Sequence, residues 1–182
     1  MLLTRLFKFI IFALCSAFVF TSVTVVGAYA VFPCKYKTQV YAICAKTNIP
    51  PELVFAIIKT ESSFNEEKIS SKGAVGLMQI MPDTANYVSD LYFGGKNFDL
   101  FYPDDNILIG VTYLIYLFDK FEDKKTALSA YNAGEGNVNA WLSDDKYSTD
   151  GKSLNYIPFK ETEEYCKKVL KRTQIYKILY RL

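Results

Sequence analysis

Histidine is absent from the 182 residues of this chain, and its absence narrows the chemistry that the chain can perform. Without histidine there is no Ser-His or Cys-His nucleophilic pair, and a zinc site lacks its commonest nitrogen ligand. The four cysteines form no CxxC pair, so they do not indicate a metal site. Cys34 and Cys44 could pair in an oxidising compartment, but ten residues of separation say nothing about geometry. We therefore expect no metal and no other cofactor.

Basic residues are not in excess over most of the chain. The formal net charge is +2, and both extra positive charges, Arg5 and Lys8, fall within residues 1–30, which contain no acid. The remaining residues balance at 19 basic against 19 acidic. Nucleic acid binding needs Lys and Arg clustered against phosphates, so we expect no nucleic acid partner. The chain also lacks internal repeats, and its length suits one ordinary domain, which we place at residues 33–182.

Residues 1–32 are interpreted as a targeting segment. Phe9 to Phe32 contains 24 residues without a charge, follows Arg5 and Lys8, and is long enough to span a bilayer. A signal peptide cleaved after Ala30 and an uncleaved membrane anchor both fit this pattern. The length favours the anchor, because a signal core is usually about 7–15 apolar residues. Either outcome places the domain outside the cytoplasm, in the cell envelope or secreted.

The most informative stretch begins with a helix expected from Pro51 to Glu61. Proline suits the first turn of a helix, and the apolar positions that follow are spaced to share one helical face. Glu61 lies one turn beyond them on the same face, where an aliphatic side chain is expected. Burial favours the protonated carboxylic acid, and a glutamic acid protonated near neutral pH can act as a general acid. Taken alone, such a residue more often turns to solvent, so neighbouring motifs must decide.

Residues 73–85 read GAVGLMQIMPDTA and form the second unusual stretch. Its glycines permit turns and close backbone approach, and one amide, Gln79, lies among apolar residues that include Met78 and Met81. A loop tucked into the core, with methionines as gap fillers, is an equally simple interpretation.

Five motifs then occur in an order that resembles the lytic transglycosylase domain of the soluble-transglycosylase, goose-lysozyme-like superfamily. They are ESSF (61–64), GAVGLMQIMPDTA (73–85), YPDDNILIGVTYL (102–114), AYNAG (130–134) and IPFKETEEYCKKVL (157–170). The resemblance covers residues 36–181. It implies a mainly α, lysozyme-like single domain of about six to eight helices around a glycan cleft, preceded by the N-terminal signal or membrane-anchor helix.

The resemblance also implies a reaction. Glu61 would protonate the β-1,4 oxygen between N-acetylmuramic acid (MurNAc) and N-acetylglucosamine (GlcNAc) in bacterial peptidoglycan, and would then take the proton of the C6 hydroxyl. The product is a 1,6-anhydro-MurNAc end, formed without water. Ordinary glycoside hydrolysis uses two carboxylates, and only Glu161 offers a second one, in a weaker context.

The substrate-binding residues implied by the resemblance are Ser70, Met78, Gln79, Met81, Tyr131, Asn132 and Glu161. Tyr131 would orient Glu61, Asn132 would bind sugar hydroxyl or acetamido groups, and the two methionines would form an apolar floor for a sugar ring. Structural alternatives stay open for three of them. Ser70 also fits a turn serine, Tyr131 a buried core tyrosine, and Glu161 an acid placed at the positive end of a helix.

The expected partners are peptidoglycan glycan strands, the cytoplasmic membrane through the N-terminal segment, and, as a further candidate, a larger cell-envelope assembly. Rival functions are a goose-type lysozyme that hydrolyses the same bond and, less favoured, a non-catalytic peptidoglycan-binding protein. A channel or signalling protein with a single span fits the ordered motifs poorly.

Overall fold

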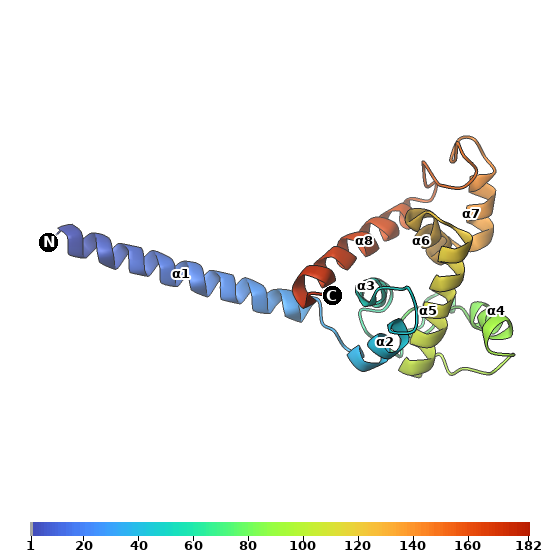
Figure 1. The fold of residues 1–182 in the computed structure, drawn as a ribbon, viewed down its shortest axis with the longest axis horizontal. Helices are drawn as coiled ribbons and strands as arrows, with labels where there is room; N and C mark the ends of the chain where they lie inside the picture. Colours follow the sequence, from blue (N-terminus) through green and yellow to red (C-terminus); the bar gives the residue numbers. More distant parts are fainter. Residues whose placement is uncertain (1) are drawn as a thin grey trace. The chain divides into compact units, whose positions relative to one another are not determined.

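The computed structural model describes residues 2–182, and its regular structure is helical (Figure 1). The helices in this range are α1 (Leu2–Val31), α2 (Lys37–Cys44), α3 (Pro51–Glu61), α4 (Pro82–Tyr92), α5 (Pro103–Lys120), α6 (Lys124–Ala133), α7 (Glu135–Leu142) and α8 (Lys160–Tyr180). Strand pairing within residues 2–182 is limited to isolated bridges, which join Val75 to Ile69 and to Ile80. The expectation of a mainly α domain with six to eight helices is confirmed by α2 to α8.

The described chain divides into two compact units, one ending at Cys34 and the other comprising Lys35–Leu182. The first unit is built on α1, a helix of 30 residues. Among residues 2–182, no helix combines the length and the apolar character that a membrane span requires. Met1, the first residue of the predicted targeting segment, lies outside the described residues.

Three helices of the second unit begin with proline, at Pro51, Pro82 and Pro103. Proline suits this position because its fixed φ is helical and the first turn needs no N–H from it. The helix α6 begins differently: the Asp123 carboxylate accepts a 2.7 Å hydrogen bond from the Thr126 N–H. The helix predicted from Pro51 to Glu61 is confirmed with these bounds.

The core of the second unit lies between α3 and α8, which make the most extensive helix–helix contact in it (Figure 1). The middle of α3 is buried on every side, and Phe55 stacks on Tyr176 of α8 with ring centroids 5.6 Å apart. Arg172 of α8 donates to the Thr60 hydroxyl at 2.8 Å. This contact ties α8 to the last turn of α3, where Glu61 lies.

Two glycines let the loop of residues 73–81 approach α5 closely. Gly76 has φ +79°, and a Cβ there would overlap the Asn106 side chain and the Leu100 carbonyl. At Gly110 of α5 a Cβ would lie 2.5 Å from the Met78 sulfur. The wholly buried Asn106 completes the contact, because its side-chain oxygen accepts from the Met78 N–H at 2.8 Å. The missing side chain at Gly110 thus lets Met78 pack directly against α5.

Candidate active site

The Glu61 carboxyl lies at the C-terminal end of α3, mostly buried. Burial is the main cause that raises its pKa from 4.5 to about 7. A hydrogen bond from Tyr165 and the positive charge of Lys68 lower this pKa, and the negative charge of Glu161 raises it. At neutral pH the carboxyl is therefore close to half protonated. This protonation state suits a group that both donates and accepts a proton.

Tyr165 of α8 provides the side chain that acts most directly on the acid. Its hydroxyl is buried, and no group in the described part of the chain lies at normal hydrogen-bond distance and angle from it. Its interaction with the Glu61 carboxyl is therefore weaker than an ordinary hydrogen bond. Burial, followed by the Glu61 charge, raises the pKa of Tyr165 well above its usual range. Tyr165 is a candidate site residue that the sequence analysis did not identify. Tyr165 lies four residues after Glu161, one helical turn along α8, and this spacing could have indicated that Tyr165 lies near the site.

Tyr131 of α6 lies in the same group, but its hydroxyl has a different partner from the one expected. It donates to the Met78 backbone carbonyl at 2.9 Å, and its ring packs against Tyr113 at a centroid distance of 5.6 Å. Burial and then the Glu61 charge raise the pKa of Tyr131 far above its usual range, so the two residues are near each other. Tyr131 supports the Met78 backbone, and Tyr165 is the tyrosine that lowers the pKa of the acid.

The loop after α3 brings a cation to the end of the helix. The Lys68 ammonium donates to the Glu61 backbone carbonyl, and the Lys68 carbonyl accepts from the Gln79 amide at 3.0 Å. The same Gln79 nitrogen donates to the Gly76 carbonyl at 2.9 Å. Gln79 has φ 51°, an uncommon value for a residue with a side chain. Its amide N–H groups hold the loop, a role that sequence reasoning did not foresee.

The methionines of the predicted sugar floor differ in exposure. The Met78 side chain is wholly buried and packs against Gly110. A side chain with no exposed surface cannot touch a ligand, so the prediction that Met78 forms part of the floor is wrong. The close approach permitted by Gly110 explains the difference. Met81, just before α4, is 37% exposed and can still contact a substrate.

Ser70 serves as a turn residue in this structure. Its hydroxyl oxygen accepts hydrogen bonds from the Ala74 N–H at 2.9 Å and the Lys72 N–H at 3.3 Å. It is partly exposed, and its contacts among the described residues lie within its own loop. The role near the acid that the resemblance implies stays a prediction.

Asn132 and Glu161 lie where α6 meets the start of α8. The Thr162 hydroxyl donates to the Asn132 side-chain oxygen at 2.8 Å, which fixes the first turn of α8 against the end of α6. Glu161, one residue earlier, is exposed and close enough for its charge to raise the pKa of Glu61. The two predicted residues are thus brought to the same place, and Glu161 faces solvent there.

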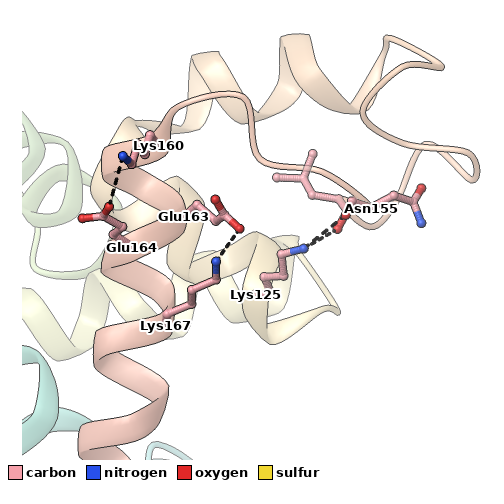
Figure 2. A network of polar contacts seen from close by, with 7 residues as sticks. Lys125, Asn155, Lys160, Glu163, Glu164 and Lys167 are labelled. Atoms are coloured by element: carbon pink, nitrogen blue, oxygen red, sulfur yellow. Dashed lines mark hydrogen bonds and ion pairs between the residues drawn. The ribbon is translucent and has the colours of Figure 1, made fainter.

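A polar network holds the segment that leads into α8 (Figure 2). The Lys125 ammonium of α6 donates to the Leu154 carbonyl at 3.1 Å and to the Asn155 carbonyl at 3.4 Å. On the exposed surface of α8, Lys167 pairs with Glu163 at 2.6 Å one turn away. The Lys125 hydrogen bonds position the segment before α8, whereas exposed ion pairs add little to stability.

The cysteines do not contribute to the site. Cys44 and Cys166 are buried and take part in no disulfide. Burial raises the pKa of Cys44 to about 11, which leaves it a protonated, unreactive thiol at neutral pH. Within residues 2–182, no three His, Cys, Asp or Glu side chains are placed to hold a metal ion.

An open cavity of about 770 Å³ lies elsewhere, between the α2–α3 connection and the C-terminal half of α5. Its lining includes Lys46, Ile49, Phe118 and Asp119, and none of the predicted site residues. It lacks the buried carboxyl and the tyrosines described above. Volume alone does not identify an active site, and the candidate site remains the group around Glu61.

Comparison with known proteins points to one family. The family model described as Transglycosylase SLT domain matches residues 40–154. The soluble lytic murein transglycosylase of Escherichia coli K12 is 36% identical over 147 residues, which cover 76% of this chain and 22% of that protein. Membrane-bound lytic murein transglycosylase C of Actinobacillus pleuropneumoniae is 34% identical over 128 residues, covering 62% of this chain and 34% of that protein.

Solved structures agree with these matches. The crystal structure of the 70 kDa soluble lytic transglycosylase from Escherichia coli superposes with a TM-score of 0.73 at 31% sequence identity. The superposed region covers 84% of this chain and 26% of that one. The chain thus spans well under half the length of the relatives it matches.

Proposed function

Since the chain belongs to the transglycosylase SLT domain family, we propose that it cleaves the MurNAc–GlcNAc β-1,4 bond of bacterial peptidoglycan by transglycosylation. The observation that carries the proposal is one mostly buried carboxyl, Glu61, whose pKa is raised to about 7 beside the buried hydroxyl of Tyr165. A single acid of this kind can complete the reaction, because no water has to be activated.

The proposed reaction uses Glu61 twice. Its protonated carboxyl gives a proton to the bridging oxygen while the bond from that oxygen to C1 of MurNAc breaks, and the GlcNAc hydroxyl leaves. The acetamido group of MurNAc stabilises the oxocarbenium-like C1. The Glu61 carboxylate then takes the proton of the C6 hydroxyl as O6 bonds to C1, which closes the 1,6-anhydro ring and restores the acid.

The surroundings of Glu61 suit both of its states. Burial favours the protonated acid before the first proton transfer. The Lys68 charge and the Tyr165 hydrogen bond lower the pKa and so stabilise the carboxylate that exists between the two transfers. Tyr131 and Gln79 would act by holding the backbone around the acid, through their bonds to the Met78 and Lys68 carbonyls.

Four further residues are proposed to contact the substrate or to act close to it. Met81 offers an exposed apolar side chain, and Glu161 an exposed carboxylate near the acid. Asn132 keeps an amide group at the junction of α6 and α8, and Ser70 lies in the loop that carries Lys68. The substrate in each case is a glycan strand of peptidoglycan.

Residues 1–32 are proposed to carry the domain out of the cytoplasm and into the cell envelope, which contains the peptidoglycan. Two observations support this: the basic residues Arg5 and Lys8 precede a long uncharged stretch, and one relative is named membrane-bound. Retention as an anchor in the cytoplasmic membrane is the form we favour, and the matching domain would then act from the envelope side, alone or within a larger assembly.

Mass spectrometry of digested peptidoglycan tests the proposed function. Transglycosylation gives anhydro ends that are lighter by one water than the reducing ends made by a lysozyme. We expect anhydro products from the wild-type chain and at least a hundredfold slower release from Glu61→Gln, which keeps the shape of the side chain but cannot donate the proton.

Glu67→Gln is the matched control, because Glu67 is an exposed glutamate in the loop that follows α3. Reducing-end products would instead identify a lysozyme. Binding without any product from the wild-type chain would identify a non-catalytic peptidoglycan-binding protein. Near-wild-type turnover by Glu61→Gln would rule out the mechanism.

A further inference from the structure

Four tyrosines follow one another outward from the Glu61 site, and we call them the tyrosine row: Tyr131, Tyr113, Tyr116 and Tyr87. The ring centroids of neighbours are 5.6 Å, 6.2 Å and 5.6 Å apart in that order. The row begins on α6, continues along one face of α5 and ends on α4. Its two outer members, Tyr116 and Tyr87, lie outside the five sequence motifs.

Polar groups accompany the outer rings. The Tyr87 hydroxyl donates to the Tyr116 hydroxyl at 3.1 Å, and the Tyr116 hydroxyl donates to the Glu135 carboxylate at 2.8 Å. Lys120 forms an ion pair with the same carboxylate and lies 5.8 Å from the centre of the Tyr116 ring. Burial, then the Glu135 charge and Tyr87, raise the pKa of Tyr113 to about 12. The row thus combines aromatic faces with neutral hydroxyl groups.

The outer end of the row is exposed. Tyr131 and Tyr113 are partly covered, whereas Tyr87 at the far end is 44% exposed. Buried tyrosines are common packing residues, but an exposed ring that is held in place by a hydroxyl bond and an edge-on ring contact adds little to a core. A ligand that enters the Glu61 site and extends beyond it would meet this ring in a fixed position.

We propose that the tyrosine row binds additional sugar residues of the glycan strand and extends the site from Glu61 toward α4. This inference rests on the proposed function, since it presumes that the ligand at Glu61 is a polysaccharide. A sugar ring presents apolar C–H faces and polar hydroxyl edges, which match aromatic faces flanked by hydroxyl and carboxylate oxygens. Sugar rings fit better than charged peptide stems, because Lys120 and Glu135 already neutralise each other.

Binding of peptide-free glycan strands to the Glu61→Gln protein tests this inference without any chemical turnover. Adding Tyr87→Ala to this protein should weaken binding roughly three- to tenfold, the usual range for one aromatic contact. Tyr87→Phe keeps the ring and should bind nearly as well. Tyr92→Ala is the matched control, since Tyr92 is a 47% exposed tyrosine on another face of the same helix.

In the active protein, the ratio of kcat/KM for long strands to kcat/KM for a tetrasaccharide should fall by the same factor with Tyr87→Ala. Equal affinities for the Tyr87→Ala and Tyr92→Ala proteins, or a loss seen only with peptide-bearing strands, would overturn the assignment. A lower melting temperature for Tyr87→Ala than for Tyr92→Ala would assign Tyr87 to packing and would count against it too.

Failure of the proposed function gives a different pattern of results. A wild-type chain that releases no anhydro product, although Tyr87 still contributes to glycan binding, would refute the enzyme and leave the tyrosine row in place. Anhydro products together with glycan binding that does not depend on Tyr87 would refute the role of the tyrosine row and would leave the proposed enzymatic function standing.

Discussion

Replacing Glu61 with glutamine should stabilise the folded chain above neutral pH while it removes catalysis. The carboxyl has a pKa of about 7 in the folded protein against 4.5 for an ordinary glutamate. Above pH 7 the folded protein must hold a buried negative charge, whereas the unfolded chain exposes the same charge to water. One pKa unit corresponds to about 1.4 kcal/mol, so the free energy of unfolding above pH 7 is lower by about 3 kcal/mol than at acid pH.

The direction follows from proton binding. Between pH 4.5 and about 7 the folded protein holds the Glu61 proton and the unfolded chain has released it. The free energy of unfolding therefore falls as pH rises through this range, and the contribution that is fully present below pH 4.5 is lost above pH 7. Glutamine binds no proton, so the Glu61→Gln protein lacks this dependence. All other titrating groups are shared by the two proteins and cancel in their difference.

Urea unfolding followed by circular dichroism at pH 4 and pH 8 measures the effect. The unfolding free energy of Glu61→Gln minus that of wild type should increase by about 3 kcal/mol between the two pH values. The same difference for Glu67→Gln, an exposed control, should stay nearly constant. A change below about 1 kcal/mol for Glu61→Gln would mean that the carboxyl is solvated with an ordinary pKa. The proposed general acid would then lose its physical basis.

Four other substitutions have defined outcomes. Lys68→Met should move the alkaline limb of the pH profile of kcat/KM to higher pH, and Glu161→Gln should move it to lower pH. The reason is that the Lys68 charge lowers the Glu61 pKa and the Glu161 charge raises it. Shifts of the same sign in the two variants would contradict this. Gly76→Ala should cost roughly 2 kcal/mol or more in urea unfolding, because its φ of +79° and the crowded backbone leave no room for a methyl group. Tyr131→Phe should cost about 1 kcal/mol for the lost hydrogen bond to a backbone carbonyl and should also lower kcat; an unchanged kcat would separate this bond from catalysis.

The features that could be predicted from the sequence depend on neighbours along the chain. Pro51 starts α3, the apolar stripe buries its middle, and helical spacing puts Glu61 on the same face. Spacing alone left a solvent-facing glutamate possible, and the neighbouring motifs decided for the mostly buried acid. The glycine inside α5 also indicated close packing, because Gly110 is costly in a helix unless a neighbour needs the space. The order of five motifs then indicated the family, which no single motif could do.

The features that could not be predicted depend on contacts between distant segments. The apolar residues of the loop fit a core and a sugar floor equally well, and only Asn106 and Gly110 on α5 decide that Met78 is buried. Likewise, a tyrosine near a glutamate reveals no hydrogen-bond partner. The Tyr131 hydroxyl donates a hydrogen bond to a carbonyl 53 residues away in sequence, and Tyr165 is the tyrosine that lowers the pKa of the acid.

Asn106 has one more consequence, for how the loop of residues 73–81 moves. Its side-chain oxygen holds the Met78 N–H, and its nitrogen donates to the Val75 carbonyl at 2.9 Å and the Leu100 carbonyl at 2.8 Å. Loops usually open by themselves, at little cost in free energy. This one is fastened to the middle of the domain by the buried Asn106 amide and by the Tyr131 hydroxyl, so its backbone protons should exchange with heavy water about as slowly as those of α5. The segment that supports the acid then keeps its shape for as long as the whole domain stays folded.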